Sequence, residues 1–138
     1  MTNEELLQEA KKARLHAYAP YSHFQVGAAL LTKEGRIYHG CNIENAAYGP
    51  TNCAERTAFF KAVYAGERDF DRIAIAGAPE GQEPEAMCAP CGVCRQVMME
   101  FCQPGSFRII LADGKGGVAD FTLQELLPYG FGAANLSK

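Results

Sequence analysis

Two short segments of the chain carry side chains that suit metal-assisted hydrolysis. The first is Cys53-Ala54-Glu55, and the second runs from Pro90 through Cys91 to Cys94. Each stands where a helix is expected to begin, and free amides at such an end favour thiolate over thiol. Two helix ends can therefore supply three thiolates to one Zn²⁺ ion per subunit. Three protein ligands leave the fourth position of a tetrahedral zinc open, which is typical of a catalytic site.

The residues next to these cysteines indicate how such a site would work. Glu55 lies two positions beyond Cys53, too close for a comfortable fourth ligand but well placed to face the open position. Zinc can bring the pKa of bound water close to neutrality, and Glu55 could accept the released proton. Three thiolates also make the centre anionic. Because Arg56 and Arg95 directly follow Glu55 and Cys94, we expect one or both to donate hydrogen bonds to the thiolates.

Other interpretations of these residues stay open on the sequence alone. Cys88 repeats the same spacing before Cys91, so those two could form the ligand pair, although Pro90 favours the later pair by placing it in the first helical turn. A Cys-x-x-Cys pair also suits a structural zinc or a redox centre, with Cys88 or a histidine as a further ligand. The other cysteines and the histidines lack ligand spacing and are expected to have structural roles (Cys41, Cys102, His16, His23, His39).

The elements that must position these residues follow from hydrophobic periodicity and turn signals. Helices are predicted from a Thr2 or Asn3 cap to before Pro20, over 53–64, from Pro90 through Phe101, and from a Thr122 cap to Leu127. Strands are predicted over 26–32, 37–41, 73–77, 107–111 and 118–121, with loops over 42–52 and 78–89. Leu15 and Val93 are assigned to the apolar faces of their helices. The alternation predicts an α/β fold, a three-layer α/β/α sandwich with a small mixed β-sheet.

Length and composition limit the class of protein. The 138 residues suit one compact domain, which we place at 1–138. The formal net charge is -3 and the basic residues are scattered, which argues against a nucleic acid polymer as a partner. No stretch has the length of a transmembrane span, and the first residues lack the pattern of a signal peptide. We therefore expect a cytoplasmic protein without a membrane partner.

Further segments surround these residues in a fixed order. They are Ala19-Pro20-Tyr21-Ser22, Phe24, Val26-Gly27-Ala28-Ala29-Leu30, Asn42-Ile43-Glu44-Asn45-Ala46, Tyr48, Cys53-Ala54-Glu55-Arg56, Pro90-Cys91-Gly92-Val93-Cys94, and Leu126-Leu127-Pro128 ahead of Phe131. Together they resemble the small homotetrameric cytidine deaminases, zinc enzymes that act on nucleosides. The joint pattern spans nearly the whole chain and is far more specific than any one motif. Only the loop over 78–89 looks longer than the usual connection of the family.

The resemblance implies roles for individual residues. Asn42 and Glu44 would hold the ribose hydroxyls, and Phe24 would pack against the nucleoside. The backbone amide of Ala54 would bind the ring carbonyl, and the carbonyl of Ala89 would accept from the exocyclic amine.

The resemblance also implies a mechanism and an assembly. Glu55 would take a proton from the activated water, protonate the ring nitrogen beside C4, and later deliver a proton to the departing amine. In the family, neighbouring subunits complete each site through residues that match Tyr48 and Phe131. A homotetramer with shared sites is therefore expected.

Three functional hypotheses follow. The leading one is hydrolytic deamination of cytidine and 2′-deoxycytidine to uridine and 2′-deoxyuridine with release of ammonia, as in pyrimidine salvage. An alternative keeps the chemistry and changes the substrate to a related aminonucleoside such as a nucleoside antibiotic, or to a base on RNA, against which the lack of a basic stripe argues. A different class is a zinc-stabilised binding or redox module without turnover. That class requires four protein ligands on the metal and gives Glu55 no role.

Overall fold

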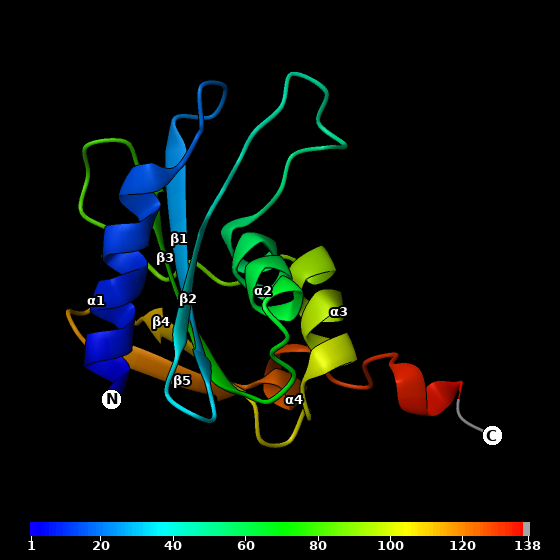
Figure 1. Ribbon diagram of the computed structural model, residues 1–138. Coiled ribbons are helices and arrows are strands. Elements are labelled where there is room, and N and C mark those ends of the chain that lie inside the picture. The colour runs from blue at the N-terminus through cyan, green and yellow to red at the C-terminus, as the bar shows by residue number, and fades with distance from the viewer. Residues whose placement is uncertain (137–138) are drawn as a thin grey trace.

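The computed structural model describes residues 1–136 and places one mixed sheet between two layers of helices (Figure 1). The helices are α1 (Asn3–Ala13), α2 (Ala54–Tyr64), α3 (Gly92–Phe101) and α4 (Leu123–Leu126), with 3₁₀ turns η1 (Arg14–His16) and η2 (Ala133–Asn135). The strands are β1 (Phe24–Thr32), β2 (Ile37–Cys41), β3 (Phe70–Pro79), β4 (Arg108–Ala112) and β5 (Val118–Thr122). They lie in the order β2-β1-β3-β4-β5, and β3 and β4 are parallel while the other neighbours are antiparallel. The predicted α/β/α sandwich with a mixed sheet is confirmed.

The central strands separate two cores. In β1, Ala28 and Leu30 point to the core beneath α2 and α3, whereas Ala29 and Leu31 point to the core beneath α1. The same alternation recurs in β3 and β4, because successive side chains of a strand point to opposite faces. Both faces of the central strands are thus covered, which explains why their sequences are nearly continuous apolar runs. In Figure 1, α1 lies on one side of the sheet and α2 and α3 lie on the other.

Some boundaries and burial assignments differ from the sequence expectations. β1 and β3 extend beyond the predicted strands, because the backbone of Phe24 pairs with that of Pro79. Leu15 is exposed, since α1 changes into the tighter turn η1 after Ala13 and the spacing of an α-helix is lost. Val93 is exposed as well, because the buried stripe of α3 runs through Cys94 and Met98 instead. None of the helices within residues 1–136 is long and apolar enough to cross a bilayer.

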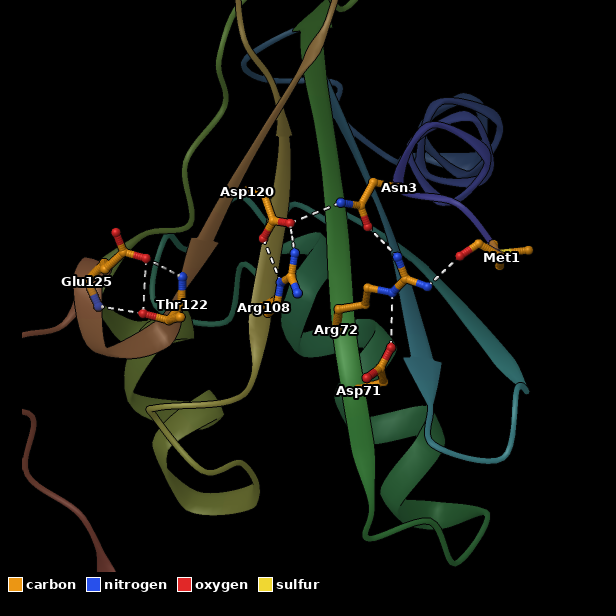
Figure 2. A network of polar contacts seen from close by, with 8 residues as sticks. All are labelled: Met1, Asn3, Asp71, Arg72, Arg108, Asp120, Thr122 and Glu125. Atoms are coloured by element: carbon orange, nitrogen blue, oxygen red, sulfur yellow. Dashed lines mark hydrogen bonds and ion pairs between the residues drawn. The ribbon is translucent and has the colours of Figure 1, made fainter.

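A polar network anchors the start of the chain at the end of the sheet away from Phe24 (Figure 2). Asn3 Nδ2 donates to Asp120 Oδ2 at 3.0 Å, and the Arg72 guanidinium donates to the side chain of Asn3 and to the carbonyl of Met1. Asp120 also pairs with Arg108 on the adjacent strand. This network joins the N-terminus of α1 to β3, β4 and β5.

The backbone of helix α2 comes very close to β2 at Gly40. At Gly40, a Cβ atom would lie 2.2 Å from the carbonyl oxygen of Ala54 and 2.6 Å from the amide nitrogen of Ala58. Because these are backbone atoms of α2, no side chain fits at position 40 while the helix stays in place. The first turn of α2 carries Glu55, so this contact also sets where the candidate site lies relative to the sheet.

We expect Gly40→Ala to lower the free energy of unfolding by about 3 kcal/mol, since the added methyl must push α2 off the sheet. Chemical denaturation followed by circular dichroism measures this effect. Gly105→Ala is the matched control, because a Cβ there would meet its nearest neighbour, Gln124 Oε1, at 3.6 Å, an ordinary contact. Equal stability of the two variants would contradict the close packing of α2 on β2.

Candidate active site

Three cysteine side chains from two helix ends converge at one place. Cys53 is the N-cap of α2, Cys91 is the N-cap of α3, and Cys94 lies one turn further into α3. The three sulfur atoms lie within 4.8 Å of one another, and they form the group of potential metal ligands found among residues 1–136. Cys88 is not part of this group. The geometry therefore favours Cys91 with Cys94 over the earlier pair, and it offers three ligands rather than four.

The spacing of the sulfur atoms fits a zinc ion. The Sγ atoms of Cys53 and Cys91 are 3.7 Å apart. In a tetrahedral site with zinc–sulfur bonds of about 2.3 Å, two sulfur ligands are about 3.8 Å apart. Neither N-cap cysteine uses its side chain to cap its own helix, so both sulfurs are free to turn toward a common centre. The donor set and its dimensions fit the metal that the sequence predicts.

The charges around the cluster already favour thiolate at one position. A hydrogen bond from the Cys94 thiol lowers the pKa of Cys53 to about 5, and hydrogen bonds from Arg56 and Cys91 act in the same direction. The pKa of Cys94 is raised in turn, because its thiol donates that bond and is buried. Binding of a metal would remove the remaining thiol protons, so metal uptake and proton release are linked.

Glu55 lies beside the sulfur cluster and is almost fully buried. Its side chain is 4% exposed. Burial raises the pKa of Glu55 to about 7, and the negative charge of Cys53 adds to the increase. A carboxyl group with a pKa near neutrality can both accept and donate a proton under physiological conditions. Position, burial and proton affinity thus all suit a group that moves protons.

The two arginines next to the site have different contacts. Arg56 Nη2 donates to Cys53 Sγ at 3.3 Å, and Nε of the same guanidinium is buried without a hydrogen-bond partner among the described residues. A donor is therefore available beside the sulfurs. Arg95 instead donates from Nε to the carbonyl of Pro90 at 2.9 Å and from Nη1 to that of Leu126 at 2.8 Å. Arg56 acts on the thiolates, whereas Arg95 holds the backbone that leads into α3.

Backbone groups at the start of β1 and in the turn before it hold the two residues expected at the ribose. Asn42 accepts from the amide of Val26 at 2.9 Å and donates to the carbonyl of Phe24 at 2.8 Å. Glu44 accepts from the amides of Tyr21 and Ser22 at 3.0 and 3.1 Å and from the Ser22 hydroxyl. The hydroxyl and these amides lower the pKa of Glu44, which keeps it ionised. Glu44 also lines a cavity of about 320 Å³ with neighbouring side chains (Tyr21, Ser22, Asn45, Tyr48, Thr51).

The backbone groups expected to bind the base lie at the start of α2 and just before the start of α3. Ala54 is the first residue of α2, so its amide has no partner within the helix. Ala89 precedes Pro90 in the segment that leads to Cys91, and this residue is exposed. Phe24 opens β1 and is 39% exposed.

The two aromatic residues expected to serve a neighbouring subunit lie on the surface. Tyr48 is 84% exposed and Phe131 is 55% exposed. The segment around Phe131 runs along the outside of α3, where Gln96 Nε2 donates to the carbonyl of Phe131 at 2.8 Å. Beyond it the chain extends away from the body of the molecule, and the loop before α2 projects from the other end (Figure 1). Both surfaces are therefore available to another chain.

The chain matches a model of the cytidine and deoxycytidylate deaminase zinc-binding region over residues 1–107. This is more than half of its length. The chain belongs to this family. A cytidine deaminase from Sporosarcina psychrophila is 53% identical over 99% of this chain and 96% of that protein. A crystal structure of cytidine deaminase from Burkholderia pseudomallei superimposes with a TM-score of 0.85, is 49% identical, and covers 95% of this chain and 100% of its own. A blasticidin-S deaminase from Bacillus cereus is more distant, at 34% identity over 90% of this chain and 88% of that protein.

Two supports of the site are absent from the sequence interpretation. Ser22 holds Glu44 in place, and the only signal for it is its position in the Ala-Pro-Tyr-Ser motif. Arg14 is buried and donates to the carbonyls of Gln25, Ala78 and Pro79 at 3.2, 3.0 and 3.1 Å. It ties the ends of β1 and β3 together beside Phe24. As an arginine at a helix end it looks like an ordinary surface residue, so the sequence gives no sign of this role.

We expect Arg56→Gln to weaken zinc binding by about 10–100-fold, because it removes the guanidinium donors beside the thiolates. The rate and extent of zinc transfer to a chromophoric chelator measure this. Arg95→Gln is the matched control with the same change of charge, and we expect it to keep zinc nearly as well as the wild type because its contacts go to backbone carbonyls. Loss of zinc from Arg95→Gln but not from Arg56→Gln would reverse the two assignments.

Proposed function

We propose that this chain catalyses the hydrolytic deamination of cytidine and 2′-deoxycytidine to uridine and 2′-deoxyuridine, with release of ammonia. The observation that carries the proposal is the buried Glu55 carboxyl group beside three converging cysteine sulfurs. Three ligands leave room for water at the metal, and a nearby group with a pKa of about 7 can move the protons of that water. The family of the chain and the names of its relatives supply the substrate class.

Each step of the reaction has a group of this chain to perform it. Zinc bound by the three cysteines supplies Lewis acidity that makes water a stronger nucleophile near neutral pH. Glu55 accepts a proton from the attacking water and donates it to the ring nitrogen beside C4. The water oxygen forms a bond to C4, and Glu55 then takes the remaining proton of this hydroxyl and delivers it to the amine. The amine leaves as ammonia when its bond to C4 breaks, and C4 becomes a carbonyl. The amide of Ala54 and the carbonyl of Ala89 orient the base so that C4 faces Glu55.

Hydrogen bonds to the backbone hold the two side chains that are proposed to bind the sugar. The Glu44 carboxylate is fixed by Ser22 and Tyr21 and can accept from ribose hydroxyls. Two of the four hydrogen-bonding positions of the Asn42 side chain are used by the backbone of β1, which leaves a donor and an acceptor for the sugar. Neither residue requires a 2′-hydroxyl, which is consistent with both nucleosides as substrates.

A homotetramer with shared sites is part of the proposal. Cys91, a candidate metal ligand, is exposed in the single chain, and so is one side of Phe24. Catalysis of this kind is favoured where bulk water is excluded. Tyr48 and Phe131 are large exposed side chains, so a neighbouring copy can cover the site with them.

We expect Glu55→Gln to lower kcat for cytidine by about 10²–10⁴-fold, because the amide neither accepts nor delivers the protons. Loss of the ultraviolet absorbance of cytidine measures turnover. The variant should retain zinc and should resist denaturant at least as well as the wild type, since a buried carboxylate is replaced by a neutral side chain of the same shape.

Glu85→Gln is the matched control, because Glu85 is exposed in the loop before Cys88. Zinc-loaded wild type that leaves cytidine and deoxycytidine unchanged would contradict the proposed substrate. The same assay with blasticidin S then tests the alternative substrate.

We expect Phe131→Ala to lower kcat/KM for cytidine by about tenfold, as is typical when a buried aromatic anchor is truncated. Co-expression of Phe131→Ala chains with Glu55→Gln chains should restore part of the activity, because some sites then combine an intact Glu55 with Phe131 of a neighbour. Activity of the mixture no higher than that of the separate variants would place Phe131 in its own site. Gel filtration of the wild type tests the tetramer directly.

A further inference from the structure

A small cluster that contains no metal ligand packs beneath the exposed ring of Phe24. Val26 on β1 pairs with Gly77 on β3, and Phe24 lies two residues before Val26. All three positions have the same parity as Ala28, Leu30, Ile73 and Ile75, so they face the side of the sheet that α2 and α3 cover. Cys88 approaches this surface from the segment that leads to Cys91 and packs against the same core.

The missing side chain of Gly77 is what allows these groups to meet. A Cβ atom at this position would lie 2.7 Å from Cys88 Sγ, 3.0 Å from Cε1 of the Phe24 ring and 3.1 Å from Cγ2 of Val26. The sulfur, the ring edge and the methyl group thus surround the space that any other residue would fill. Because protein interiors are close-packed, the position of the ring depends on what occupies that space.

The backbone beneath this cluster is fixed from the opposite face of the sheet. The buried Arg14 guanidinium holds the carbonyls of Gln25, Ala78 and Pro79, which flank Phe24 and Gly77. The strands therefore have little freedom to move apart and relieve a clash. A change of volume at Gly77 or Cys88 must be absorbed by the side chains, and Phe24 is the most exposed among them.

We propose that Gly77 and Cys88 are a matched pair of positioning residues that hold the Phe24 ring in place for the nucleoside. The sulfur of Cys88 occupies the space that Gly77 leaves empty, and together they support one edge of the ring while its exposed side stays available to the substrate. Cys88 thereby has a packing role that is separate from the metal cluster, although it stands at ligand spacing from Cys91. This inference rests on the proposed function, in which Phe24 packs against the nucleoside.

If Gly77 and Cys88 act as a pair, the effect of the double substitution on KM should differ from the combined effects of the two single substitutions. Gly77→Ala adds a methyl group 2.7 Å from the sulfur and 3.0 Å from the ring. It should displace the ring, which raises KM for cytidine by about tenfold. Cys88→Ala removes the support and should raise KM by about threefold. The double variant Gly77→Ala/Cys88→Ala relieves the contact of the new methyl group with the sulfur but keeps its contacts with Phe24 and Val26. Its KM should therefore fall part of the way back, to about threefold above wild type.

The reaction rate distinguishes positioning from a general loss of structure. Glu55 and the three metal ligands are unchanged, so kcat and zinc content should stay within about twofold of wild type in all three variants. Cys41→Ala and Gly105→Ala are the controls for loss of a thiol and gain of a methyl group elsewhere, and neither should change KM. Should Gly77→Ala fail to fold, recovery of folding and KM in the double variant still tests the pairing.

Two results would overturn the inference. One is an unchanged KM in Cys88→Ala together with an unchanged KM in the double variant relative to Gly77→Ala. The other is an equal fall in kcat and kcat/KM, which would place the effect on the chemical step. The free energies of unfolding of the same four proteins test the pairing without any substrate. A wild type that is inactive on cytidine but shows this coupling would therefore reject the proposed function and retain the packing pair.

Discussion

Everything at the candidate site depends on the meeting of two helix N-termini. An N-cap residue keeps an extended backbone and lies at the positive end of its helix, and here both N-caps are cysteines, Cys53 and Cys91. The helix ends supply electrostatic support for thiolate where the sulfurs converge. They also leave the Ala54 amide without a partner in the helix and place Glu55 within the first turn. The proposed ligand, proton carrier and hydrogen-bond donor are thus three consecutive residues at the start of α2.

Burial and charge are balanced against each other around this point. The same low-polarity environment that raises the pKa of Glu55 to about 7 would make three thiolates costly. Arg56 offsets part of that cost from one side and the metal would offset the rest. The other half of the site is held by backbone contacts: Asn42 bonds to the start of β1, Glu44 bonds to the turn before β1, and Arg14 bonds to the ends of β1 and β3. The proposed catalytic group, Glu55, therefore lies on a helix, whereas Tyr48 and Phe131, which are expected to reach a neighbouring subunit, lie in exposed loops.

Much of this arrangement can be predicted from the sequence because it rests on local rules. Pro90 indicates where α3 begins and so which cysteines share its first turn. Short apolar runs between turn residues indicate the strands, and the site motif indicates zinc and a general acid-base group. The features that the sequence does not indicate are tertiary contacts. The bond from Arg95 to Leu126, the contact of Gly40 with α2 and the bonds that bury Arg14 all arise between segments that are not neighbours along the chain. Leu15 shows the reverse case, in which a helical pattern continues past the residue where the helix actually changes its pitch.

The distribution of the three cysteines along the chain has a consequence for how the protein is made. Cys91 and Cys94 are neighbours in any conformation, whereas Cys53 is separated from Cys91 by 38 positions and joins them only when α2 and α3 are packed. An ion bound to all three sulfurs is thus a cross-link that closes a long loop, and a ligand that binds the native state alone stabilises it by mass action. The fraction of newly synthesised chains that stay folded will then rise with the concentration of free zinc.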